Sequence, residues 1–211
     1  MLQNQLNESM KTLLLTGFEP FGGEHVNPSQ VVVEGISTMS FANVNVITAI
    51  LPVSRFAATQ ALSAAIAQFK PDVVMMLGEA GTRARVSPER VAINLDDFRI
   101  PDNGGHQPQN EPIVPDGPAA YFATLPIHKL VASMIAADIP AGISNSAGTY
   151  LCNRVFYWVM HLIHSQNLPI QAGFIHLPYL HEQSLNKRDC PSLARATQIE
   201  AIRLAILACV A

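Results

Sequence analysis

The chain has 211 residues, of which 49% are apolar and only 14% are charged, and its formal net charge is −3. A chain of this length predicts a single large domain that buries a substantial core of its own. The slightly acidic balance and the scatter of the basic residues argue against a nucleic-acid partner. No apolar run approaches the roughly 18 residues of a membrane span, so we expect no membrane binding.

The amino-terminal residues and the cysteines give further information on the domain organisation and the location of the protein. Residues 1–10, MLQNQLNESM, are polar and contain no apolar signal core, so we expect a short leader followed by one domain over residues 11–211. Three cysteines are too few for a disulfide framework and favour a reducing cytoplasm. The small share of charged residues predicts that part of the apolar surface meets another subunit.

Apolar runs alternate with stretches of helical periodicity along most of the chain. Residues 82–126 interrupt the alternation with many Pro, Gly, Asp and Asn residues, although residues 90–100 alternate like a strand. Strands are predicted at residues 11–18, 42–53, 73–81, 141–148 (ending in a turn) and 171–178, and helices from residue 28 onward and at residues 56–69, 127–138, 152–166 and 192–210.

Strands separated by helix-length stretches predict right-handed crossovers. The fold class that follows is α/β, a single-domain α/β/α sandwich around a twisted, mostly parallel sheet. In such sheets, sites form beyond the carboxyl ends of the strands. We therefore expect residues 17–23, 78–83 and 144–152 to meet the strand end at His176 on one rim of the sheet.

The stretch SNSAGTYLCN places Cys152 at the start of an apolar helix. Unpaired N–H groups and a partial positive charge at a helix start favour a thiolate, which predicts a nucleophilic cysteine. The same N–H groups are suited to hold the oxyanion of a tetrahedral intermediate. The alternative is a small buried cysteine in a packed turn.

A cysteine nucleophile acting on an amide needs a base. Of seven histidines, His176 is the best placed, because it ends a strand that we expect beside the strand leading into Cys152. The alternative is a core histidine bonded to a carbonyl group. A carboxylate is needed to orient the imidazole, and the spacing leaves Glu89, Asp96 and Asp97 as equal candidates.

Metal and phosphate sites are poorly supported. His161 and His164 have a helix-compatible spacing, but no third ligand is apparent, so we expect no metal site. The glycines of GEAGTR, residues 78–83, follow a strand, but this turn lacks the lysine and Ser/Thr of a phosphate-binding loop.

Four stretches together resemble pyroglutamyl peptidase type I, a family also called pyrrolidone-carboxylate peptidase. They cover nearly the whole chain after about residue 11 and occur in the family's order. They are LLTGFEPFGG with NPS, GEAGTR with SPERVAINLDDFRIPDNGGHQP, SNSAGTYLCN, and GFIHLPYL. The resemblance implies a cysteine peptidase that removes an N-terminal pyroglutamyl residue from peptides without a metal or an organic cofactor. It also implies an α/β/α sandwich that is frequently a homotetramer.

The resemblance assigns roles by position. Cys152 matches the nucleophile, His176 the general base and Glu89 the third member of the triad. Arg90, beside Glu89, matches a residue thought to line the oxyanion region. The domain over residues 11–211 is then the catalytic domain.

The resemblance also implies how the substrate ring is bound. Phe18 and Phe21 resemble two pocket phenylalanines that sandwich the flat lactam, although both rings would equally fill the core under the turn. Asn27, the expected cap of the helix that starts at Pro28, is also placed near the substrate. Glu79 stands where many members carry glutamine, and an ionised glutamate only accepts hydrogen bonds.

Two other functions remain compatible with these residues. One is a different Cys-His-Glu amidohydrolase, such as a glutaminase-like enzyme. The other is a non-catalytic relative that binds pyroglutamyl N-termini.

Overall fold

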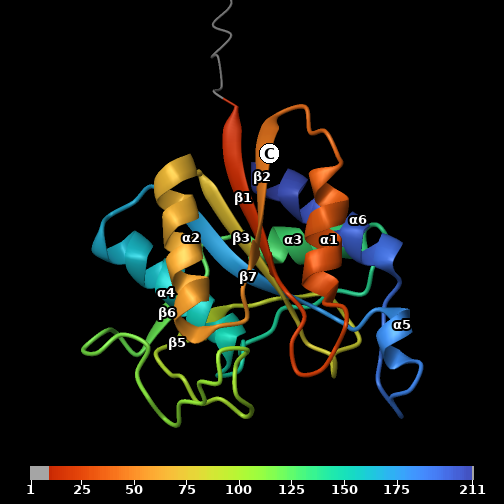
Figure 1. The fold of residues 1–211 in the computed structure, drawn as a ribbon. Coiled ribbons are helices and arrows are strands. Elements are labelled where there is room, and N and C mark those ends of the chain that lie inside the picture. The colour runs from red at the N-terminus through yellow and green to blue at the C-terminus, as the bar shows by residue number, and fades with distance from the viewer. Residues whose placement is uncertain (1–9, 211) are drawn as a thin grey trace, which may run out of the picture.

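The computed structural model describes residues 10–210 as a five-stranded sheet between two layers of helices (Figure 1). All neighbouring strands are parallel except the last pair, which confirms the expected single-domain α/β/α sandwich. The leader expected at residues 1–10 lies, apart from Met10, outside the described residues. The strands are β1 Lys11–Phe18, β2 Val44–Leu51, β3 Val73–Glu79, β4 Ser87–Pro88 and β7 Gln171–Leu177, in the order β2-β1-β3-β7-β4.

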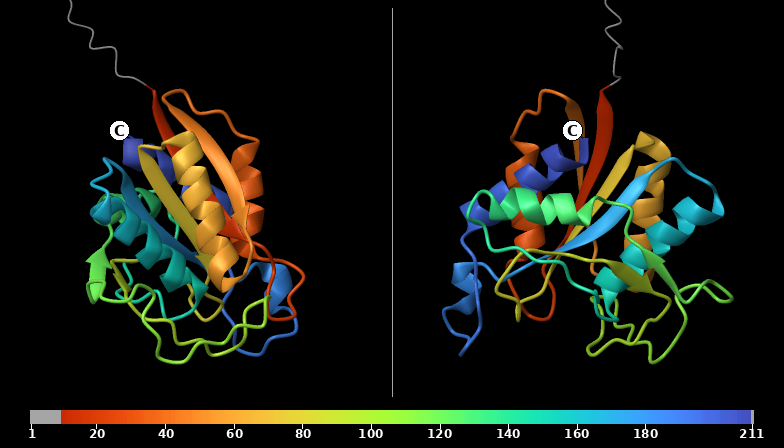
Figure 2. Two further views of the ribbon diagram at one scale, coloured as in Figure 1. Left: turned by 60° about the vertical axis from the view of Figure 1, so that its left-hand side comes forward. Right: turned by 180° about the vertical axis from the view of Figure 1, so that it is seen from behind.

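The helices divide between the two faces of the sheet, as the two views of Figure 2 show. One face is covered by α1 Pro28–Ser37, α3 Ile127–Ile135 and α6 Arg195–Val210, and the other by α2 Arg55–Phe69 and α4 Leu151–Ser165. A short helix, α5 His181–Ser184, follows β7. Within residues 10–210, no helix is long and apolar enough to cross a membrane.

The apolar runs form strands because both faces of the sheet are buried. Leu13 and Leu15 of β1 point into the core beneath α1 and α6, whereas Leu14 between them points into the core beneath α2 and α4. All three side chains are fully buried. A strand covered on both sides requires a continuous apolar run rather than alternation.

The start of α1 follows the local chemistry of its cap. Asn27 Oδ1 accepts from the Ser29 backbone N–H at 3.0 Å and from Ser29 Oγ at 2.7 Å, and Pro28 occupies the first turn. The predicted cap is therefore confirmed.

The strand predicted at residues 141–148 is wrong. This segment forms bridges from Ala141 to Val86 and from Ser144 to Glu89, and its backbone hydrogen bonds to residues 86–90 end at Ser144, so no strand extends to residue 148. Side-chain hydrogen bonds between Ser144 and Ser146 and between Ser146 and Gly148 bend the backbone locally, and such bonds compete with a strand ladder. The neighbours of β7 are consequently β3 and β4, and not a strand leading into Cys152.

The strand predicted at residues 90–100 is shorter than expected. Only β5 Val91–Ile93 is extended, and it pairs with β6 Ala120–Phe122 in a separate two-stranded sheet. The pairing ends at Asn94, whose side chain donates to the Val114 and Gly117 carbonyl groups. The short elements β4, β6 and α5 carry no periodic signal and were not predicted.

The carboxyl ends of the parallel strands meet at one rim, the lower side of the molecule in Figure 1. There β1 ends at Phe18, β3 at Glu79 and β7 at Leu177. Since β2 lies on one side of β1 and β3 on the other, the strand order reverses at this point, which is where open sheets place their sites.

Candidate active site

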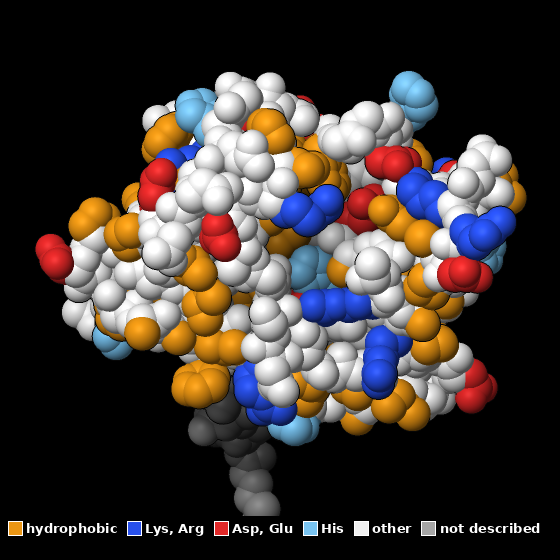
Figure 3. All heavy atoms as spheres, turned by 90° about the horizontal axis from the view of Figure 1, so that it is seen from below, with side chains coloured by type: hydrophobic (Ala, Val, Ile, Leu, Met, Phe, Trp, Pro, Cys, Tyr) orange, Lys and Arg blue, Asp and Glu red, His pale blue; other side chains and the backbone are white. Residues whose placement is uncertain are grey.

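A cavity of about 660 Å³ opens at this rim. Viewed from the carboxyl ends of the strands, the surface is hollowed near its middle, with basic side chains at the edge of the hollow (Figure 3). The side chains that line it come from β3, β7 and α4, from the loops after β1, β3 and β7, and from the segments before α4. They include Phe21, Glu24, Glu79, Thr82, Arg83, Arg99, Ser146, Tyr150, Cys152, His176 and Tyr179.

His176 and Glu89 form a buried pair at the floor of the cavity. His176 Nδ1 lies 2.7 Å from Glu89 Oε1, and Glu89 is fully buried. The pair exists because β4 runs antiparallel to β7, which places Ser87 opposite His176 and brings the next residues of the chain alongside. The Glu89 backbone N–H donates to the Phe174 carbonyl group at 2.8 Å and continues this pairing.

The other two candidate carboxylates lie elsewhere. Asp96 is buried between the guanidinium groups of Arg55 and Arg154. Asp97 is exposed, and its side chain accepts from the Asn110 backbone N–H. The structure thus brings Glu89, and neither aspartate, to His176.

The charges of this pair follow from its surroundings. Burial opposes the charge on Glu89, but the hydrogen bond from His176 and the charge of Arg83 outweigh it and lower the pKa of Glu89. Burial lowers the pKa of His176 and dominates the opposing effect of Glu89. An ionised carboxylate only accepts, so Nδ1 of a neutral His176 carries the proton and Nε2 is left as an acceptor.

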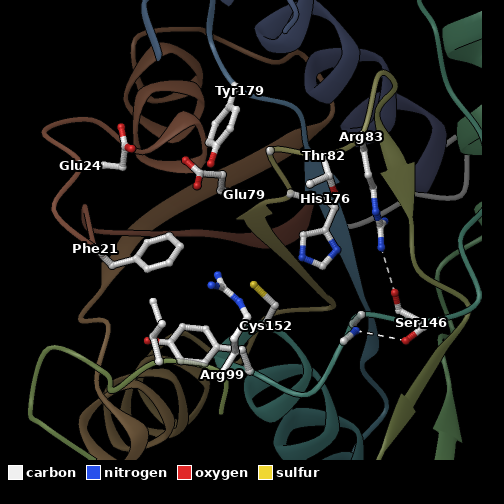
Figure 4. Close-up of a pocket in the computed structure, with 17 residues that line it drawn as sticks. Phe21, Glu24, Glu79, Thr82, Arg83, Arg99, Ser146, Cys152, His176 and Tyr179 are labelled. Atoms are coloured by element: carbon white, nitrogen blue, oxygen red, sulfur yellow. Dashed lines mark hydrogen bonds between the residues drawn. The ribbon is translucent and has the colours of Figure 1, made fainter. Parts of the chain in front are cut away.

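Cys152 is the second residue of α4, and its sulfur lies over β3. A Cβ atom built on Gly78 would be 2.7 Å from Cys152 Sγ, and Gly78 is the register partner of His176 across β3 and β7. Neighbouring strands lie about 4.8 Å apart, so the sulfur rests beside the imidazole. Figure 4 shows both groups in the middle of the cavity, between Glu79 and Arg83.

The thiol of Cys152 is not acidic in this environment. Burial, followed by the charges of Glu89 and Glu79, raises its pKa to about 12, against the smaller effect of Arg83. The expectation that the helix start alone makes a thiolate is therefore wrong, because the desolvation of this half-buried cysteine and two carboxylates outweigh it. The resting side chain is a neutral thiol.

The arginine expected at the oxyanion region lies away from the cavity. Arg90 Nε donates to Asn145 Oδ1 at 2.8 Å, and Arg90 does not line the cavity. Arg83 does line it and donates to Glu89 Oε1 at 2.5 Å and to the Ser146 carbonyl group at 2.9 Å. Arg99 also lines it, and its guanidinium group points inward (Figure 4). Arg83 stands in the turn GEAGTR, where it was a possible partner of Glu79, but it pairs with Glu89 instead; Arg99 stands in the stretch RIPDN, and sequence reasoning assigned it no role.

A narrow apolar slot adjoins the main cavity at Cys152. Phe21 is half-buried, with its ring centroid 5.9 Å from that of Tyr150, whereas Phe18 is only 3% exposed and also packs in the core under α2 and α4. Phe18 therefore both fills the core and borders the slot. The slot is lined by Phe18, Phe21, Asn27, Val53, Glu79, Tyr150, Leu151 and Cys152.

Glu79 borders both the slot and the main cavity. Its Oε2 accepts from Gln183 Nε2 at 2.7 Å. Burial raises the pKa of Glu79 to about 7, with Glu24 adding to the shift and Gln183 and Lys187 opposing it. Sequence reasoning missed Gln183, because α5 has no periodic signal and lies far from Glu79 along the chain.

The paired histidines of α4 have other contacts. His161 Nδ1 lies 3.0 Å from the Tyr121 hydroxyl group, and the His164 ring packs against the Tyr121 ring. Across residues 10–210, no group of three His, Cys, Asp or Glu side chains is arranged to hold a metal ion.

At the carboxyl rim of the sheet, a cysteine lies next to a His-Glu pair and an apolar slot. This arrangement is that of a cysteine-type hydrolase. The chain belongs to the pyroglutamyl peptidase family, whose model matches residues 10–211. It is 44% identical over 200 residues to a pyrrolidone-carboxylate peptidase of Vibrio vulnificus, covering 95% of this chain and 93% of that protein. It is 45% identical over 197 residues to one of Yersinia pestis, covering 93% and 92%. The crystal structure of pyroglutamyl peptidase I from Bacillus amyloliquefaciens superposes with a TM-score of 0.92 at 41% identity, covering 95% of each chain. The family and the enzyme class expected from sequence are thereby confirmed.

Proposed function

We propose that this chain hydrolyses the amide bond that follows an N-terminal pyroglutamyl residue, with Cys152 as nucleophile, His176 as base and Glu89 as its orienting carboxylate. The observation that carries the proposal is the 2.7 Å contact between His176 Nδ1 and Glu89 Oε1. This contact leaves Nε2 as the acceptor on the side of the cavity that holds the Cys152 sulfur. The family supports the choice of substrate.

The first step forms a bond between Cys152 Sγ and the pyroglutamyl carbonyl carbon. Since the pKa of the Cys152 thiol is raised to about 12, its proton passes to His176 Nε2 as the sulfur attacks. Glu89 remains ionised and stabilises the imidazolium that forms. The neutral resting pair thus becomes charged only during the reaction.

The negative charge on the carbonyl oxygen needs hydrogen-bond donors. The N–H groups at the start of α4 are free of helical partners and carry the partial positive charge of the helix end. Arg99, whose guanidinium group points into the cavity, adds positive charge on this side. We assign this role to Arg99 in place of Arg90.

The second half of the reaction reverses the proton transfer. The imidazolium of His176 gives its proton to the leaving amine as the C–N bond breaks, which leaves a thioester on Cys152. His176 then takes a proton from water, the hydroxide adds to the thioester carbonyl, and the C–S bond breaks as His176 returns the proton to the sulfur. The products are pyroglutamate, the shortened peptide and the free thiol.

The aromatic slot is the proposed seat of the lactam ring. It is apolar, it borders Cys152, and it is lined by Phe18 at the end of β1 and by Phe21 from the turn that follows. A flat ring between aromatic side chains gains about 0.5–1.5 kcal/mol per pair beyond the burial of its area. The rest of the peptide would extend into the larger cavity.

The decisive experiment is the rate on a pyroglutamyl chromogenic amide. Cys152→Ala removes the nucleophile, so we expect a loss of at least about 10³-fold with an unchanged fold. Cys190→Ser, at a half-buried cysteine outside the cavity, is the matched control and should keep the rate. Substantial activity of Cys152→Ala, or activity of the wild type on free glutamine in place of pyroglutamyl amides, would contradict the proposal.

Assembly and location complete the proposal. A homo-oligomer, a tetramer by resemblance, is supported by large apolar side chains on the surface: Phe122 is 71% exposed, Ile135 56% and Leu185 79%. A cytoplasmic location is supported by three cysteines that are all free thiols. Light scattering of the purified chain tests the first point.

A further inference from the structure

The slot presents one free polar atom to the ring it would bind. Asn27 lines the slot, but its Oδ1 accepts from Ser29 and its Nδ2 donates to the Glu19 carbonyl group at 3.0 Å. The other lining side chains are apolar, apart from the reacting thiol, the Tyr150 hydroxyl group and Glu79. The Tyr150 hydroxyl group donates to the Pro101 carbonyl group at 3.1 Å. Glu79 is therefore the group that meets the polar edge of a bound ring.

The contacts of Gln183 fix which oxygen of Glu79 is available. Gln183 Oε1 accepts from the Leu180 backbone N–H at 3.0 Å, so its Nε2 must be the atom that donates to Glu79 Oε2 at 2.7 Å. Nε2 also lies 3.3 Å from the Val26 carbonyl group, which agrees with this orientation. Oε2 is thus held as an acceptor, and any proton on Glu79 is carried by Oε1.

The charges around Glu79 leave both of its states accessible. Glu24 and Lys187 face it from the loops after β1 and α5, Tyr179 from the loop after β7, and Cys152 from α4. Lys187 Nζ donates to Glu24 Oε1 at 2.7 Å, so this pair places little net charge beside Glu79. The pKa of Glu79 is raised to about 7, chiefly by burial.

We propose that Glu79 selects the ring that enters the slot through its own charge. The neutral carboxyl group donates from Oε1 to the carbonyl group of the pyroglutamyl lactam, whereas the carboxylate repels that carbonyl group and favours a cationic five-membered ring, that of a free N-terminal proline. Phe18, Phe21 and Tyr150 suit either ring, since aromatic faces also attract cations. The inference rests on the proposed function of the same slot.

Glu79→Gln isolates this effect. The new Oε1 would accept from Gln183, which turns the new amide nitrogen to the slot as a donor at every pH. We expect the ratio of wild-type to variant kcat/KM on a pyroglutamyl chromogenic amide to fall about tenfold per pH unit above the pKa of Glu79, mainly through KM. The ratio cancels the titration of Cys152 and His176, which both proteins share.

Inhibition by small ring amides tests whether the charge of Glu79 favours a cationic ring over the neutral lactam. Against the wild type, prolinamide, which stays cationic to about pH 8, should inhibit more strongly at pH 8 than at pH 6, and pyroglutamide should do the reverse. In Glu79→Gln, both inhibition constants should be independent of pH over this range. Inhibition of the wild type by prolinamide that does not strengthen with pH would overturn the inference.

Two neighbouring variants move the pH dependence in opposite directions. Glu24→Gln removes a negative neighbour and frees Lys187, so the decline in pyroglutamyl activity should start at a lower pH. Lys187→Met should shift it to a higher pH. A merely structural Glu79 would show neither shift, and that result would overturn the inference.

The failures can be told apart. If neither the wild type nor Glu79→Gln cleaves a pyroglutamyl amide at any pH, the proposed function itself fails. If both cleave it with a ratio that is constant from pH 6 to pH 8.5, the proposed function stands and the role of Glu79 is refuted.

Discussion

Two carboxylates, the buried Glu89 and the half-buried Glu79, lie near Cys152, and their pKa values are shifted in opposite directions. Burial opposes the charge on both. Glu89 is met by His176 and Arg83, and its pKa is lowered, whereas Glu79 is met by the neutral amide of Gln183 and by Glu24, and its pKa is raised to about 7. The neighbours, and not the depth of burial, decide which carboxyl group is ionised at neutral pH.

This difference separates two tasks within one cavity. A permanent negative charge at Glu89 fixes the tautomer of His176 and stabilises the imidazolium. A carboxyl group that is neutral near pH 7 is suited to donate to an uncharged ligand beside the slot. Changes on the Glu89 side should therefore act on kcat, and changes on the Glu79 side on KM and on the pH dependence.

Among changes that test this difference, the largest effect is expected from Glu89→Gln, although its loss of activity should be smaller than that of Cys152→Ala, which removes the nucleophile. The amide oxygen would replace Oε1 as the acceptor from His176 Nδ1 and from Arg83, so the tautomer is kept, but the negative charge that stabilises the imidazolium is lost. Because only the charge is lost, kcat should fall by about 10²–10³-fold with little change in KM. Steady-state kinetics of the wild type and the variant measure the loss of kcat. A change confined to KM would contradict the assignment of separate tasks to Glu89 and Glu79.

The next effect is expected at Gly78, which joins the two sides. It directly precedes Glu79, it pairs with His176, and its missing side chain makes room for Cys152 Sγ. A Cβ atom there would lie 2.7 Å from that sulfur and 2.6 Å from the Phe174 ring. Gly78→Ala should displace the sulfur by about 1 Å and lower kcat/KM by about 10²-fold.

A matched glycine controls for the cost of crowding. A Cβ atom on Gly35 of α1 would lie 2.6 Å from Ile199 Cδ1, far from the cavity along the fold. Gly35→Ala should alter stability and leave kcat/KM unchanged. Equal losses of activity in the two variants would show that crowding, and not the placement of the sulfur, accounts for the loss at Gly78.

Sequence patterns predicted the strands of the central sheet well wherever the apolar run was continuous. The buried runs of β1, β3 and β7 and the cap at Asn27 appear where expected, because each depends on residues that are close along the chain. The rim that gathers the site follows from the parallel order of these strands.

The details of the site depend on contacts that spacing does not encode. Glu89 reaches His176 through β4, a two-residue strand whose antiparallel pairing has no periodic signature. Arg90, adjacent in sequence, turns to Asn145, and Arg83 takes the place beside Glu89 because of the turn after β3. Composition alone gave no means to choose between the two arginines.

The charge states were equally beyond the reach of local patterns. The start of α4 predicted an acidic Cys152, but the two carboxylates that oppose its ionisation come from β3 and from the residue after β4. The charge state of Glu79 depends first on its burial and then on Gln183, which lies 104 residues further along the chain and opposes the rise of its pKa. Such cross-chain neighbours are visible only in the folded structure.

The smallest of the expected effects is on the stability of the protein. Its measurement tests the difference in charge between Glu79 and Glu89 without a substrate. The pKa of Glu79 rises from an ordinary value of 4.5 in the unfolded chain to about 7 in the folded one, so between these values the folded state binds more protons. Its contribution is fully present below pH 4.5 and is lost as the pH rises through 7. The expected loss is on the order of 2–3 kcal/mol. Glu89, with its lowered pKa, behaves in the opposite way: its contribution is present at neutral pH and is lost as the pH falls.

Urea unfolding of the wild type and of Glu79→Gln at pH 5 and pH 8 measures this difference. Glutamine does not titrate, so the free energy of unfolding of the wild type should drop relative to that of the variant as the pH rises. For Glu89→Gln, the comparison has to be made below pH 4.5, where the wild type should lose stability relative to the variant as the pH falls. Parallel stability curves for the wild type and Glu79→Gln would mean that Glu79 is ionised throughout, like Glu89, and that the two sides of the cavity do not differ in charge.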